Sequence, residues 1–469
     1  MSDNEEEQHK IYREDTRIPC KYGTKCYQKN AVHHEKYKHP PGKKMKKGKG
    51  VKDSVKNKKR KIENKNETSK DFPKKRKMEQ ENDDTINEKL HCTVSDAEST
   101  AKHNDEYNKN ITELSSDNTN NVKDVINQCT IASLLKDCNI NIENDTVSQN
   151  DIKIIISHLF LTEMPDDFFH FYKLCKDINE KDCFNALKDL HLQLVGPYDV
   201  FRDEFLSFKV DSKEALLKHW RYYYDPPEFQ TIVKVDDKDG LHFGYWRDVI
   251  AEKPIFIAKN KAAINCLIEP VAENIFGAID AYIEEKLKSS NPFEKTRIAL
   301  LHKKLKDFAK ENKINLDKQT ANMQARERQV VARTFHKAGI VVPYNKKTEL
   351  GYRSLAVTDR ELQKILEQIK EASTAEAKRV PMSKLEEVIR LATIAADECD
   401  FGTCLELGHD LFSSGISAVQ NKALNMLSLA YNLLQRSQFL EILQTHLKDR
   451  TKSLNPSVLS TTLVINEKT

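Results

Sequence analysis

The sequence predicts an α+β protein with a two-lobed body, a mixed α/β first lobe and an all-α second lobe. Within residues 149–344, short runs rich in β-branched and aromatic residues alternate with helical patterns, whereas residues 345–450 show helical periodicity alone. A cysteine- and histidine-bearing segment and a long polar stretch come first. The predicted units are a small zinc finger at 14–41, a disordered linker at 42–148, lobes at 149–344 and 345–450, and a flexible tail at 451–469.

The composition limits the classes of protein that the chain can belong to. Of its 469 residues, 38% are hydrophobic and 32% are charged, so a sizeable part is expected to be disordered. No run of about 18 apolar residues is present, and the first residues are acidic and polar, which argues against a membrane span, a membrane partner and a secretory signal. The ten cysteines are therefore expected to be thiols or metal ligands of a reducing compartment.

The first informative motif holds two cysteines and two histidines at short spacings. Five residues separate Cys20 from Cys26, six lead to His33, and five more lead to His39. Two thiolates and two imidazoles suit tetrahedral Zn²⁺, and a segment this short would need the metal in order to fold. His34 is an alternative to His33 that the spacing leaves open.

The same motif is unlike a DNA-reading finger, which has about twelve residues between its second cysteine and its first histidine. It resembles the poly(ADP-ribose)-binding zinc finger, which has a basic residue three positions before the first cysteine and an aromatic-glycine pair after it. Arg17, Tyr22 and Tyr27 match that pattern. The resemblance implies that these three residues bind poly(ADP-ribose), because aromatic rings stack on adenine and cations hold the pyrophosphate.

The predicted linker is rich in lysine between Lys43 and Lys77 and cannot form a core. The runs at 57–61 and 73–77 are typical of nuclear localisation signals, and their charge would attract nucleic acid weakly and without sequence preference. Residues 130–135 are interpreted as a short helix or a docking peptide within an otherwise disordered stretch.

The mixed lobe begins near Asp151, where apolar residues recur at helical spacing. Strands are predicted at 229–235, 241–246 and 254–258, with Asp239-Gly240 as a hairpin turn. Helices are predicted at 262–288 and 292–312. In the second lobe we expect helices at 359–373, 383–398, 404–413, 418–435 and 438–447.

The segment from Ala395 to Gly402 is the most unusual feature of the second lobe. The expected helix would begin with a capping box of Ser383 and Glu386 and stop at Phe401-Gly402. Asp397, Glu398 and Asp400 would then crowd a helix C-terminus, where the helix dipole disfavours negative charge. Such a violation of a local rule indicates a functional site, and a solvated acidic turn is the alternative.

The body as a whole is similar to the histone poly-ADP-ribosylation factor family. The similarity covers about three hundred residues, and the finger matches the arrangement of insect members. The matching strings are 219–229, 334–343, 351–353, 397–402, 405–408 and 429–434.

This resemblance implies a protein without enzyme activity of its own. Family members bind the catalytic domain of a DNA-damage-activated poly(ADP-ribose) polymerase, which binds NAD⁺, and complete its active site. Glu398 would then be the general base on a serine hydroxyl of histones or of the polymerase. Asp397, Tyr352, Arg353, Cys399 and Asp400 would bind the partner, with Arg353 beside Glu398. The expected location is the nucleus, on chromatin at sites of DNA damage, and the free protein is expected to be a monomer.

Other functions remain open from the sequence. The body could be a catalytically silent scaffold tethered to poly(ADP-ribose) by its finger. A self-sufficient ADP-ribosyltransferase is disfavoured because no His-Tyr-Glu set for NAD⁺ is evident. A hydrolase that uses Cys399 with His409 is also disfavoured, because packing explains both residues.

Overall fold

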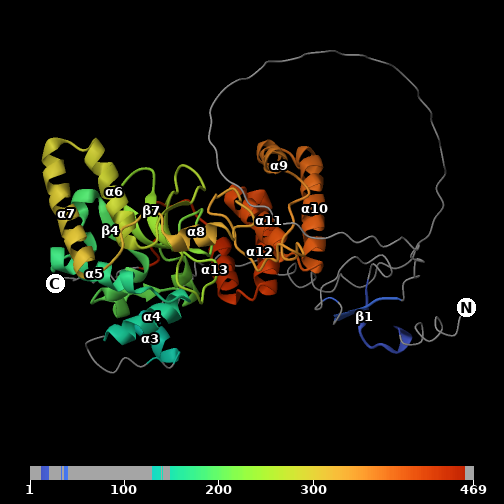
Figure 1. Cartoon of the computed structure of the whole chain (residues 1–469), viewed down its shortest axis with the longest axis horizontal. Coiled ribbons are helices and arrows are strands. Elements are labelled where there is room, and N and C mark those ends of the chain that lie inside the picture. Colours follow the sequence, from blue (N-terminus) through green and yellow to red (C-terminus); the bar gives the residue numbers. More distant parts are fainter. Residues whose placement is uncertain are drawn as a thin grey trace, which may run out of the picture. The chain divides into compact units, whose positions relative to one another are not determined.

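The computed structural model describes residues 12–20, 33, 36–40, 129–138, 140 and 148–459 (Figure 1). The chain contains two compact units, residues 1–124 and residues 125–469, which are treated separately below. Tyr22, Cys26, Tyr27 and His34 lie outside the described residues, as do both lysine-rich runs. In the first unit, β1 (Ile18–Pro19) pairs in parallel with β2 (Tyr37–Lys38).

The mixed lobe contains a five-stranded antiparallel sheet in the order β4-β6-β7-β8-β9. The predicted strands β6 (Phe229–Val235) and β7 (Leu241–Trp246) are confirmed, and Gly240 lies in the turn between them with a positive φ of 66°. The remaining strands of the sheet are β4 (Leu192–Leu194), β8 (Phe256–Lys261) and β9 (Glu269–Ala272). The large core of this lobe packs against the sheet.

Helices and short 3₁₀ turns surround the sheet. The α-helices are α3 (Ile131–Asp137), α4 (Gln149–Phe160), α5 (Asp166–Ile178), α6 (Ile275–Ser289), α7 (Pro292–Glu311) and α8 (Ala321–Glu327). The 3₁₀ helices are η2 (Cys183–Asn185), η3 (Lys188–Leu190), η4 (Gly196–Phe201), η5 (Phe205–Ser207) and η6 (Glu214–Lys218). The single helix predicted at 262–288 was wrong in its first half. Pro270 cannot donate a helical hydrogen bond and instead lies in the edge strand β9.

The second lobe is all-helical, as the periodicity predicted. Figure 1 shows its helices, coloured orange to red, gathered on one side of the body. They are α9 (Asp359–Glu371), α10 (Ala375–Asp397), α11 (Phe401–Ser414), η7 (Ser417–Val419), α12 (Gln420–Leu433) and α13 (Ser437–Lys448). They enclose the second large core.

Two local predictions in this lobe were wrong. The helix α10 begins after Thr374, which caps Ala377, and not at the predicted capping box of Ser383 and Glu386. It runs through Pro381, which is buried, so packing offsets the helical hydrogen bond that proline cannot donate. Phe401-Gly402 does not stop this helix but begins α11.

The folded body begins earlier and ends later along the chain than the sequence predicted. In the stretch assigned to the linker, β3 (Cys129–Thr130) pairs with β5 (Lys209–Val210), and Ile131 is fully buried. In the predicted flexible tail, the backbone N–H of Trp220 donates to the carbonyl of Pro456 at 3.0 Å. Both ends are ordered because they add hydrogen bonds and apolar contacts to the mixed lobe.

The boundary predicted between residues 344 and 345 does not separate the two cores. Several apolar side chains that precede the boundary, among them Leu217, Phe335 and Val342, belong to the core of the helical lobe. A buried polar contact joins the lobes as well. Oε1 of Glu228 lies 2.8 Å from the donating Tyr431 hydroxyl and 3.2 Å from Nε2 of His409. Burial alone would raise the pKa of Glu228, but His409 and Tyr431 lower it.

None of the helices in the described part of the chain has the length and apolar character needed to cross a membrane.

The Glu228 contact predicts a stability effect at the lobe interface. Replacing Tyr431 by Phe removes one donor from a buried carboxylate, which should lower the free energy of unfolding by about 1–3 kcal/mol. Urea denaturation of the full chain measures this change. An unchanged free energy would show that Tyr431 does not contribute to holding the lobes together.

Candidate functional site

The candidate site forms where α10 ends. The N–H of Cys399 donates to the carbonyl of Ala396 at 2.9 Å, and the N–H of Asp400 donates to that of Ala395 at 2.8 Å. This pair of bonds is the Schellman motif, and Cys399 occupies its left-handed position with φ 71°. The sharp reversal leaves Asp397 exposed and buries its two acidic neighbours, Glu398 at 6% exposure and Asp400 at 5%.

Because of the reversal, the three acids do not all lie at the same helix end, whereas the sequence had predicted that they would. Asp397 and Glu398 lie at the C-terminal end of α10, where the helix dipole disfavours them. Asp400 instead precedes the first residue of α11, where the dipole of that helix favours a negative charge. The segment is therefore not a solvated acidic turn.

Arg353 joins the two buried carboxylates. Its Nε donates to Oδ2 of Asp400 at 2.6 Å, and its Nη2 donates to Oε2 of Glu398. Partial burial by itself lowers the pKa of Arg353, but the bonds to Glu398 and Asp400 raise it above its usual value. The guanidinium therefore stays charged and fixes the direction of the Glu398 carboxylate.

The segment that carries Arg353 is attached to the start of α11 through its backbone. The N–H of Gly402 donates to the carbonyl of Gly351 at 2.9 Å, and the N–H of Arg353 donates to Oγ1 of Thr403 at 3.1 Å. Oδ1 of Asp400 accepts the N–H of Gly351 at 2.9 Å. Gly351 has a φ of 110°, and a Cβ there would collide with the carbonyl of Pro343, so the position requires glycine.

Tyr352 is half-buried and packs against the core of the helical lobe. Burial raises the pKa of the Tyr352 hydroxyl, and the nearby Glu406 carboxyl on α11 raises it further. Glu406 is itself 7% exposed, and burial raises its pKa to about 7. The sequence analysis missed Glu406 and Thr403 as site residues. The signal for Glu406 was an acid between Leu405 and Leu407 in an apolar helix.

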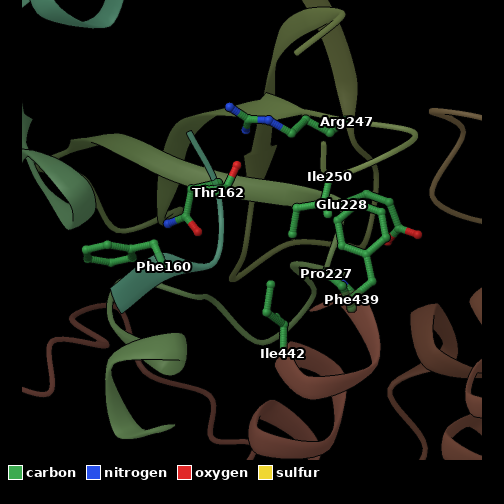
Figure 2. Close-up of a pocket in the computed structure, with 9 residues that line it drawn as sticks. Phe160, Thr162, Pro227, Glu228, Arg247, Ile250, Phe439 and Ile442 are labelled. Atoms are coloured by element: carbon green, nitrogen blue, oxygen red, sulfur yellow. The ribbon is translucent and has the colours of Figure 1, made fainter. Parts of the chain in front are cut away.

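The structure thus brings together the six residues proposed for the body: Tyr352, Arg353, Asp397, Glu398, Cys399 and Asp400. A carboxylate held in one orientation beside a solvent-exposed acid can accept a proton from a hydroxyl group that another molecule presents. The cavity in Figure 2 lies elsewhere, between the lobes, where Thr162, Arg247, Phe439 and Ile442 are among its lining residues. Its volume of about 10 Å³ admits about one water molecule.

In the first unit, Cys20, His33 and His39 converge as a metal site would require. Their ligand atoms lie within 4.8 Å of one another, with 3.6 Å from Sγ of Cys20 to Nε2 of His33 and 3.1 Å between the two Nε2 atoms. Two ring nitrogens and a sulfur aimed at one point fit Zn²⁺. His33 is thus a member of the cluster, and Cys26, the fourth predicted ligand, lies outside the described residues.

Arg17 lies three residues before Cys20 and is more exposed than its partner Asp15. Its Nε bonds both carboxylate oxygens of Asp15 at 3.0 Å. These hydrogen bonds lower the pKa of Asp15 to about 2. Asp15 thereby holds the guanidinium at the surface.

The chain thus combines a module whose cysteine and histidine side chains converge as metal ligands with a two-lobed body that carries a buried carboxylate–arginine site. Residues 151–450 match the family model of histone PARylation factor 1, and the chain belongs to that family. Residues 17–42 match the PBZ domain, a zinc finger, and the Cys/His/His cluster supports a zinc site there. The chain is accordingly an accessory factor of poly(ADP-ribose) polymerases and not a stand-alone enzyme.

Curated relatives agree with this assignment. The chain is 37% identical over 305 residues to histone PARylation factor 1 of Mus musculus, covering 65% of this chain and 88% of the relative. The corresponding protein of Bos taurus is 38% identical over 307 residues, covering 64% and 88%. That of Danio rerio is 39% identical over 299 residues, covering 63% and 85%.

Burial of Glu406 predicts a pH-dependent stability difference. Its pKa is about 7 in the folded protein against an ordinary value of 4.5, so between these values the folded state binds more protons than the unfolded state. The free energy of unfolding therefore falls as the pH rises through this range. Glu406→Gln should escape this loss and gain on the order of 2–3 kcal/mol relative to wild type between about pH 4.5 and pH 7.

Urea denaturation at several pH values measures that difference, with Glu367→Gln on the exposed face of α9 as the control. If the free energy of unfolding changes with pH in the same way in wild type and in Glu406→Gln, then Glu406 is not a buried group with a raised pKa.

The metal cluster predicts that the finger folds independently of the body. Cys20→Ala should lower the zinc content of the purified full chain, because three or fewer ligands bind Zn²⁺ far more weakly. Mass spectrometry of the metal measures the loss. Thermal unfolding of the body should not change, since its two cores contain none of the finger residues that the structure describes. An undiminished zinc content would remove Cys20 from the ligand set.

Proposed function

We propose that the helical lobe binds the catalytic domain of a DNA-damage-activated poly(ADP-ribose) polymerase and contributes Glu398 to a shared active site. The polymerase binds NAD⁺, and Glu398 acts as the general base that takes the proton from a serine hydroxyl of a histone or of the polymerase. The observation that carries this proposal is the buried Glu398 carboxylate, held by Arg353 at a sharp turn beside the exposed Asp397.

The chemistry explains why a second protein would be needed. A serine hydroxyl is a weak nucleophile at neutral pH, whereas an Asp or Glu acceptor is already ionised. Modification of serine therefore requires an added base within hydrogen-bonding distance of the hydroxyl. In this proposal Arg353 orients that base. Asp400 holds Arg353 in place by accepting a hydrogen bond from its Nε atom.

The other predicted residues divide by position. Asp397 is exposed and Tyr352 and Cys399 are partly so, which suits contact with the polymerase. Asp400 is buried behind Arg353, so its proposed part in partner binding is to position the arginine.

The finger would bind poly(ADP-ribose) through Arg17, Tyr22 and Tyr27. Because the polymer grows where the polymerase is active, a tethered finger would raise the local concentration of the body there. The lysine-rich linker would direct the protein to the nucleus and add weak, salt-dependent contacts to nucleic acid. The protein would thus act on chromatin at sites of DNA damage, as a monomer when free.

The competing function is a scaffold that reads poly(ADP-ribose) while its body contributes no catalytic group. The finger match favours this reading, because a finger alone suffices for it. It predicts that Glu398 can be replaced without loss of function.

A reconstituted reaction separates the two functions. It combines DNA-activated polymerase, NAD⁺, a histone H3 tail peptide and the full chain as wild type or Glu398→Gln. Loss of the base should reduce hydroxylamine-resistant, serine-linked ADP-ribose by about 10²–10⁴-fold. Glu387→Gln, which alters an exposed glutamate paired with Arg390 on the same helix, should behave as wild type. Equal serine modification by wild type and Glu398→Gln would favour the scaffold.

A further inference from the structure

The hydroxyl of Thr403 forms two hydrogen bonds, and both are to the backbone of Arg353. Its Oγ1 accepts the N–H of Arg353 at 3.1 Å and donates to the carbonyl of Arg353 at 2.7 Å. Thr403 lies on α11, fifty residues after its partner, and is 2% exposed. One buried hydroxyl thus satisfies both polar groups of the arginine backbone, as a neighbouring strand would do.

This use of a helical threonine is not the ordinary local one. A threonine within a helix commonly donates its hydroxyl to a carbonyl one turn earlier in the same helix. Thr393 on α10 does this, since its Oγ1 donates to the carbonyl of Ile389 at 2.9 Å. Thr403 instead bonds a segment that is distant in the sequence. Its hydroxyl therefore ties the start of α11 to the residue that carries the guanidinium.

The backbone of Arg353 matters because it sets the point from which a long side chain starts. The side chain is 39% exposed, and its guanidinium must reach Asp400 through Nε and Glu398 through Nη2 at the same time. An arginine side chain has many rotamers, and only some of them reach both carboxylates. With its N–H and carbonyl both bonded to Thr403, the backbone of Arg353 cannot turn without losing two buried hydrogen bonds.

We propose that Thr403 is a positioning residue of the shared active site: it fixes the backbone of Arg353, and through the guanidinium it fixes the carboxylate of Glu398. The proposal rests on the proposed function, in which Glu398 is the general base. Because the Thr403 hydroxyl is buried, it faces neither the polymerase nor the serine. Its removal should therefore lower the maximal rate of serine modification more than the affinity for the polymerase.

The test varies the concentration of the full chain in the reaction of DNA-activated polymerase, NAD⁺ and a histone H3 tail peptide. Thr403→Val keeps the shape of the side chain and removes the hydroxyl. Its maximal rate of serine-linked ADP-ribose formation should fall by about 10- to 100-fold, since a displacement of about 1 Å can cost that much. The concentration of the chain that gives half of the maximal rate should change by less than about threefold.

Two further variants distinguish positioning from damage to the fold. Thr403→Ser retains the hydroxyl and should keep a maximal rate within about threefold of wild type. Thr393→Val removes a hydroxyl that bonds only its own helix, and it should behave as wild type. A wild-type maximal rate in Thr403→Val, or a loss in Thr403→Ser as large as that in Thr403→Val, would overturn the proposal.

A double variant tests whether Thr403 acts through the base. In a Glu398→Gln background there is no carboxylate to position, so adding Thr403→Val should cause little further loss of maximal rate. If the two losses multiply, Thr403 does not act through Glu398, and the proposal is wrong.

NMR of the free protein separates failure of this proposal from failure of the proposed function. The Arg353 Nε–H donates to Asp400, and its exchange with water reports how firmly the guanidinium is held. This exchange should become at least about tenfold faster in Thr403→Val and stay unchanged in Thr403→Ser and Thr393→Val. If Glu398→Gln modifies serine as well as wild type, the proposed function is wrong, and the exchange rates still decide whether Thr403 positions Arg353. Unchanged exchange in Thr403→Val would refute that role.

Discussion

The contact of Arg353 with both Glu398 and Asp400 is the interaction on which the rest of the site depends. One guanidinium binds two buried carboxylates, which follow it by 45 and 47 residues in the sequence. Removing Arg353 would leave two buried carboxylates without their cation, which is destabilising because the uncompensated charges remain buried. The left-handed Cys399, the glycine at 351 and the Thr403 hydroxyl all serve to hold the three charged groups in register.

Helix α11 connects this site to the remainder of the body. In its first turn, Gly402 donates a hydrogen bond to the segment that carries Arg353. Further along the helix, the His409 ring forms a hydrogen bond with Glu228, and Asp410 accepts one from the backbone N–H of Phe335. Nearly the whole helix is buried, so its polar side chains face other parts of the protein and not water. The orientation of Glu398 is therefore coupled to the packing of both lobes, which a short exposed loop could not provide.

The finger and the body are stabilised by different physical means. In the first unit, a cysteine and two histidines aim their ligand atoms at one point, and a metal ion would supply the folding energy. The body instead relies on two large hydrophobic cores. This independence suits a protein in which one part is proposed to find poly(ADP-ribose) while the other meets the enzyme that makes it.

The sequence by itself determined the features that depend on near neighbours along the chain. Runs rich in β-branched and aromatic residues predicted β6 and β7, and helical periodicity predicted the all-α lobe. Spacing made Cys20, His33 and His39 candidate ligands, with His34 left open as an alternative to His33. Tertiary structure alone decided that α10 passes through Pro381, that Asp400 belongs to the start of α11, and that residues 451–459 pack on the mixed lobe. It also decided the contacts of Glu228 with His409 and Tyr431, because contacts between distant segments depend on packing and leave no local signal in the sequence.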